Sequence, residues 1–140
     1  MRTTLLLLLA AFLLFLASAA PAQQPALKAV GTVKQLMKAI VIPSSDVIFK
    51  VAAEEPKNDE QWAAVQNSAL ALAEAGNLLM IGNRAKDQGD WKKHSQALVD
   101  LGAAALKAAE AKDAEAVSKT GDDIYEVCEG CHNKYMEKPK

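Results

Sequence analysis

Three residues that can hold a cofactor stand together near the end of the chain, in the segment Cys128-Glu129-Gly130-Cys131-His132. C-x-x-C-H is the pattern for covalent attachment of c-type haem. On an α-helix, residues three and four positions apart share one face, so both thiols and the imidazole would point the same way. Each thiol could then form a thioether bond with one haem vinyl group. The sequence therefore predicts one covalent haem c, attached through Cys128 and Cys131, with His132 as the proximal iron ligand.

Three other uses of the motif are open. A redox dithiol usually lies near a βαβ pattern, and the sequence has no stretch that reads as a strand. A disulfide that encloses only two residues would constrain the unfolded chain very little. A structural zinc ion wants four ligands, whereas the motif offers three and only His94 remains elsewhere in the chain. These comparisons favour haem.

The residues that lead up to the motif are expected to be helical, because apolar side chains recur every three or four positions. The first helix is expected to begin near Leu27 and to kink or break at Pro43, which lacks a backbone donor and crowds the preceding turn. Residues 44–46 could then cap a restart. The second helix is expected to begin at Asn58 or Asp59, with Asn58 and Gln61 as a capping box, and Asp90 and Asp113 are expected to cap the third and fourth helices.

Four amphipathic helices with short connections predict an all-α fold, a four-helix antiparallel bundle in up-down-up-down order. Much of its apolar content is alanine, and such a domain buries little apolar surface per residue. We therefore expect the bundle to enclose the covalently bound haem c and to depend on it. Of its few aromatic residues, Trp62, Trp91, Tyr125 and Tyr135 are expected in the core, and the two tyrosines, each three residues from the motif, could pack on the haem.

The first 22 residues have the features of a secretory signal peptide. Met1-Arg2 is followed by the apolar run from Leu5 to Leu16 and then by small residues up to Ala22. Ala20-Pro21-Ala22 fits a cleavage site, with an earlier alternative at Ala17-Ser18-Ala19. A retained membrane anchor is the rival interpretation, but a spanning helix needs about 20 apolar residues. The expected organisation is a signal peptide at 1–22, a cytochrome domain at 23–140, and location in the periplasm.

The last predicted helix resembles a known family over the segment Tyr125-Glu126-Val127-Cys128-Glu129-Gly130-Cys131-His132-Asn133-Lys134-Tyr135, and the first over Val33-Lys34-Gln35-Leu36-Met37-Lys38. Both segments are similar to the class II cytochromes c, the cytochrome c′ family. The resemblance implies a four-helix bundle with its haem motif near the C-terminus. Met136 departs from the family, many of whose members have a basic residue there.

The ligand on the other side of the iron decides between two functions. Met37 lies mid-face on the first predicted helix, and methionine sulfur is a common ligand opposite histidine. The resemblance implies that Met37 is the distal iron ligand, as in low-spin members of the family; helical phase alone would favour core packing. The other candidates are weaker, since Met136 follows His132 on the same helix face, Met80 ends a helix and His94 borders an apolar face.

With both axial positions filled, the chain is predicted to be a one-electron carrier that cycles between Fe(III) and Fe(II) with His/Met ligation. With the distal position open, it would bind nitric oxide or another small gas. No pairing of a catalytic base with a nucleophile is visible, so no enzyme is predicted. The expected partners are redox proteins. The net charge of −1, without a basic stripe, gives no sign of nucleic-acid binding. No membrane span is expected after cleavage, and a homodimer is left open.

Overall fold

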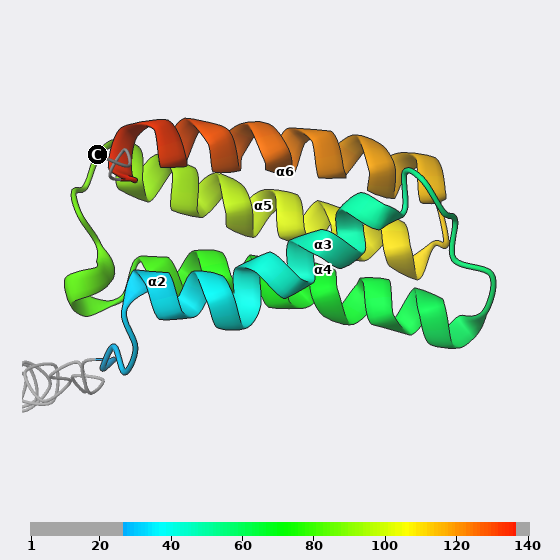
Figure 1. Cartoon of the computed structure of the whole chain (residues 1–140), viewed down its shortest axis with the longest axis horizontal. Helices are drawn as coiled ribbons and strands as arrows, with labels where there is room; N and C mark the ends of the chain where they lie inside the picture. Colours follow the sequence, from blue (N-terminus) through cyan, green and yellow to red (C-terminus); the bar gives the residue numbers. More distant parts are fainter. Residues whose placement is uncertain (1–26, 137–140) are drawn as a thin grey trace, which may run out of the picture.

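The computed structural model describes residues 27–136, and every regular element in this range is helical. The predicted signal peptide and its cleavage site at Ala22 lie outside the described residues. The elements are α2 (Val33–Leu36), η1 (Met37–Val41), α3 (Ile42–Lys50), α4 (Asp59–Leu79), η2 (Gly82–Arg84), α5 (Asp90–Glu110) and α6 (Ala114–Tyr135). They form four helical rods that alternate in direction along the chain (Figure 1). The expectation of an all-helical, four-helix chain is confirmed.

The first rod is the continuous helical run 33–50, made of α2, η1 and α3, and its middle part η1 is a π-helix. Pro43 cannot donate a backbone hydrogen bond, and in a regular α-helix its ring would clash with the carbonyl of Ala39. The wider π-turn immediately before it takes up this conflict, and the amide of Ile42 bonds to the carbonyl of Met37 instead. The expected kink or break is therefore a π-turn in an unbroken helix.

The helix ends correct several expectations. The first helix begins at Val33 rather than near Leu27, because Thr32 and Gln35 form a capping box and Leu27 lies exposed before it. Residues 44–46 cap no restart; the Ser45 hydroxyl donates to the carbonyl of Ile42 within the helix. Asp113 caps α6 by accepting from the amide of Ala116 at 2.9 Å, as expected.

Two caps differ in detail from the sequence pattern. Asn58 accepts from the amide of Gln61 at 2.9 Å, but the Gln61 side chain accepts from Lys57 instead of returning to Asn58. Only half of the expected capping box therefore forms. The expected cap Asp90 is instead the first residue of α5; Gly89 occupies the N-cap position, and the side chain of Asp87 accepts from the amide of Trp91 at 3.1 Å.

The core runs along the inner faces of all four helices. Ile48, Leu72, Val117 and Ile124 are its largest fully buried side chains, and Trp62 and Trp91 are buried as expected. Tyr125 is not: its side chain is 59% exposed, so its assignment to the core is wrong. An aromatic residue is suited to the core, but Tyr125 lies on α6 where the first helix begins to diverge from it.

The two central helices, α4 and α5, approach each other closely because small residues line their contact. A methyl group added to Gly76 would lie 2.6 Å from the carbonyl oxygen of Ser95, and one added to Gly102 would lie 2.5 Å from the amide nitrogen of Ala73. Ala69 and Ala105 on the same two helices are fully buried. Side chains any larger would force the two backbones apart.

We predict that Gly102→Ala destabilises the bundle by about 1–3 kcal/mol, because the new methyl group meets backbone atoms that cannot rotate away. Gly121→Ala is a matched control in another helix. Its methyl group would lie 3.6 Å from Ile48 and Phe49, an ordinary contact. Helix propensity should make this control neutral or stabilising by up to about 1 kcal/mol. Urea unfolding of the three chains tests the prediction, and equal effects at both glycines would contradict it.

Candidate functional site

The C-x-x-C-H segment occupies the last turns of α6, where the expected helical spacing is realised. Cys128 and Cys131 are free cysteines with partly buried side chains, and His132 is exposed. Burial raises the pKa of both thiols, and for Cys131 the neighbouring Cys128 adds to the effect. Reactive dithiols depend instead on a lowered thiol pKa. The environment of the two cysteines therefore does not favour the redox-dithiol interpretation.

The end of α6 is joined to the start of α5 by two polar contacts and by one contact between aromatic rings. The Tyr135 hydroxyl donates to Asp87, and the Lys134 ammonium lies 2.5 Å from a carboxylate oxygen of Asp90. The rings of Tyr135 and Trp91 pack edge to face, with their centroids 5.1 Å apart. Trp91 in turn donates from its indole nitrogen to the carbonyl of Leu79, at the end of α4. The segment that follows His132 is thus tied to two other helices.

A further contact reaches the motif itself. Gly130 packs against the imidazole of His94 on α5, so closely that a methyl group on Gly130 would lie 2.9 Å from the ring carbon Cε1. His94 therefore lies behind α6, against the segment that joins the two cysteines. We call these contacts the α5–α6 clasp; its members are Asp87, Asp90, Trp91 and His94 on the α5 side and Gly130, Lys134 and Tyr135 on α6.

Met37 is a partly buried residue at the start of η1, packed against the edge of the core. Its height, that is, its position along the bundle axis, follows from the register between the first helix and α6. Gly121 lies opposite Ile48, since a methyl group added to this glycine would lie 3.6 Å from the Ile48 side chain. Counting eleven residues back from Ile48 gives Met37, and eleven forward from Gly121 gives His132. The two helices are antiparallel, so Met37 and His132 lie at the same height to within about one turn, or 5.4 Å.

The first helix and α6 do not stay side by side over this height. Figure 1 shows the end of α3 close beneath α6, whereas α2 lies well apart from α6 at the end of the bundle where α6 ends. In agreement with this view, α3 packs on both α4 and α6, and η1 packs on α4. The motif and Met37 both belong to the diverging end.

Large apolar side chains are exposed along the diverging faces. Ile42 is 51% exposed and shares a face with Phe49, seven residues further along the same helix. Tyr125 meets Phe49 edge to face at 6.4 Å and precedes Cys128 by one turn of α6. Two large side chains near the motif, Ile42 on the first helix and Tyr125 on α6, are therefore more than half exposed.

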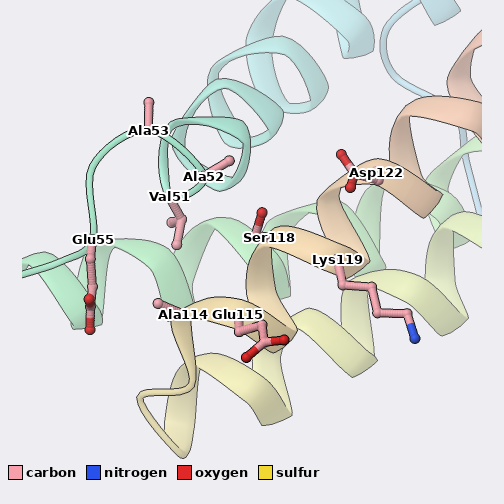
Figure 2. A pocket seen from close by; sticks show the side chains of 9 residues that line it. All are labelled: Val51, Ala52, Ala53, Glu55, Ala114, Glu115, Ser118, Lys119 and Asp122. Atoms are coloured by element: carbon pink, nitrogen blue, oxygen red, sulfur yellow. The ribbon is translucent and has the colours of Figure 1, made fainter.

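A surface hollow lies elsewhere, at the opposite end of the bundle. Figure 2 shows it between the segment that follows α3 and the first turns of α6, lined by Glu55, Glu115, Ser118 and Asp122 among others. It contains no cysteine, histidine or methionine. Nowhere within residues 27–136 do three His, Cys, Asp or Glu side chains converge as a metal site would require. This arrangement lends no support to the zinc interpretation.

Two residues with structural roles had no recognisable signal in the sequence. Arg84 is buried and donates to the carbonyls of Gly31 and Leu78, which joins the entry of the first helix to the end of α4. Asp87 accepts from the first turn of α5 and holds Tyr135. Both lie in the short segment between α4 and α5. An arginine or aspartate in a loop carries no sequence signal for its distant partner.

Two other methionines, Met80 and Met136, are weaker candidates for the iron. Met80 caps the C-terminus of α4 and lines a small hollow beside Trp91. Met136 is 60% exposed at the end of α6.

In the described part of the chain, no helix has the length and apolar character needed to cross a bilayer. Comparisons with family models, with curated proteins and with solved structures found no match to this chain.

We predict that the link between Tyr135 and Asp87 makes stability pH-dependent. Because the Tyr135 hydroxyl favours the ionised carboxylate, the pKa of Asp87 lies below its usual 3.8, helped by the amides of Trp91 and Gly89. The contribution is complete above pH 3.8 and is lost as the pH falls through the lowered pKa. Tyr135→Phe should therefore lower the melting temperature at pH 7, and this difference should shrink below pH 3.8.

Tyr125→Phe is the matched control, since the Tyr125 ring is exposed and no hydrogen bond from its hydroxyl is present among residues 27–136. Its melting temperature should follow that of the unaltered chain at every pH. A Tyr135→Phe deficit that stays constant from pH 7 to pH 2 would show that the lost stability comes from ring packing and not from Asp87.

Proposed function

We propose that this chain is a c-type cytochrome of the class II kind, which binds one haem covalently through Cys128 and Cys131 with His132 on the iron. The observation that carries the proposal is the placement of C-x-x-C-H on α6 beside an exposed apolar surface, where the first helix diverges. The motif lies on a helix, its two thiols are partly exposed, and its imidazole is exposed and outside the core.

The surrounding residues fit a flat apolar group better than a metal ion alone. Ile42, Phe49 and Tyr125 offer apolar and aromatic surface on the two diverging helices. Leaving such side chains in water is unfavourable, by about 25 cal/mol for each Å² that could be covered. A macrocycle attached to Cys128 and Cys131 would cover this surface. The proposal thereby accounts for the exposed aromatic residue next to the motif.

Met37 is our candidate for the second axial position. It lies on the first helix at the height of His132, whereas His94 lies against the backbone of α6 itself. A distal ligand must approach from the helix that faces α6, which favours Met37 over His94. The π-turn supports this role, because π-turns within α-helices are frequent at functional sites.

A haem held in this way supplies reversible one-electron exchange at its iron. The chain would fix the haem through Cys128 and Cys131, hold the imidazole of His132 in place through the rigid end of α6, and shield one side with the first helix. We infer an electron carrier that works with redox proteins and is exported to the periplasm with removal of residues 1–22. The resemblance to low-spin members of the cytochrome c′ family supports electron transfer, and the signal-peptide features of residues 1–22 support export.

We predict that the protein purified from a host with the haem-attachment machinery carries one covalent haem. Its intact mass should equal that of the chain from about Gln23 to Lys140 plus one haem, and the pigment should resist acid-acetone extraction. The double substitution Cys128→Ala/Cys131→Ala should lose the added mass and keep the same N-terminus. An extractable pigment, or a colourless native chain, would refute covalent attachment; an intact Met1 in the membrane fraction would refute export.

We also predict that the sulfur of Met37 binds the iron. Met37→Leu nearly conserves volume and should cost less than about 1.5 kcal/mol of stability, so the fold remains as a control. The substitution should shift the optical spectrum from low spin towards high spin, allow carbon monoxide to bind the reduced form and lower the reduction potential, since a thioether ligand raises it.

Met80→Leu is the matched control, because Met80 caps α4 and should leave the spectrum unchanged. Low-spin spectra in both variants would remove Met37 from the iron. A native chain that is already high-spin and binds carbon monoxide would instead favour the gas-binding alternative over electron transfer.

A further inference from the structure

The α5–α6 clasp brackets the proposed iron ligand on both sides along the helix. Gly130 precedes His132 by two residues and is covered by His94, while Lys134 and Tyr135 follow it by two and three residues and are held by Asp90 and Asp87. His132 itself is exposed. The helical segment that carries the ligand is thus fixed from behind, and its imidazole stays free.

Polar contacts at a helix end oppose its usual tendency to fray. The last turn of a helix has carbonyl groups without helical partners, and terminal turns open most readily. Here the last turn of α6 contributes Lys134 and Tyr135, and both reach across to α5 instead of projecting into solvent. Asp87 itself accepts from the amides of Gly89 and Trp91, so its carboxylate is fixed at the start of α5.

We propose that Asp87, Asp90 and His94 are positioning residues: through Tyr135, Lys134 and Gly130 they fix the orientation of the His132 imidazole toward the haem iron. The inference rests on the proposed haem attachment and adds residues that the C-x-x-C-H motif does not contain. None of the three touches the haem in this scheme. Their effect on the iron passes through the backbone of α6.

The clasp has a matched counterpart at the opposite end of the bundle. Lys112, in the turn between α5 and α6, lies 2.6 Å from a carboxylate oxygen of Asp59 at the start of α4. This ion pair is also exposed and also joins two helices, but it is remote from the motif in the sequence and at the other end of the helices. Asp59→Asn therefore controls for the general loss of an exposed ion pair.

The test compares Tyr135→Phe, Asp90→Asn and the control Asp59→Asn in the haem-loaded full chain. Amide hydrogen exchange over residues 130–136 should accelerate about 2- to 10-fold in the first two variants, the range expected for losing one hydrogen bond. The electron paramagnetic resonance spectrum of the ferric haem should broaden in the same two variants, because the imidazole would sample more orientations. The control should leave both measurements unchanged.

Faster exchange without any change in the haem spectrum would overturn the proposal, since the clasp would then stabilise the helix end alone. An equal spectral change in Asp59→Asn would also overturn it. If the native chain carries no haem, the proposed function fails first, and that failure is recognised by mass before any variant is made. Exchange over residues 130–136 in the haem-free chain then still decides whether the clasp holds α6.

Discussion

The close contact between α4 and α5 is the constraint on which the rest of this structure depends. Gly76 and Gly102 have no room for a side chain, and fully buried alanines continue the contact along both helices. The two backbones therefore pack at short range, which compensates for the scarcity of large apolar residues in the chain. The other two helices are placed by their packing on this pair.

The two outer helices are held in different ways. α6 follows α5 along its length and is fastened to it at its end by the clasp. The run 33–50 crosses the bundle obliquely, so that α3 packs against α6 and η1 packs against α4. Arg84 and Gly31 tie its entry to the end of α4. One outer helix is thus aligned with the core pair, and the other diverges from α6 at the height of the motif along the bundle axis.

This difference gives the proposed haem site its asymmetry. The proximal side would be a fixed helix whose backbone is covered from behind by α5. The distal side would be a helix with a π-turn, whose apolar residue Ile42 is half exposed. Pro43 links the two features, because it directly follows Ile42 and lies just after the π-turn, which accommodates its missing backbone donor.

The sequence by itself determined the local features: four helices, the Asp113 cap, and the three motif residues on one helical face. Each depends on contacts within about one turn, which residue type and spacing control directly. Only the tertiary structure decided that Tyr125 is exposed, that Asp87 rather than Asp90 accepts from the first turn of α5, and that Met37 and His132 lie at about the same position along the bundle axis. These features depend on the angle and register between helices, which arise from packing among residues far apart in the chain and leave no periodic signal in it.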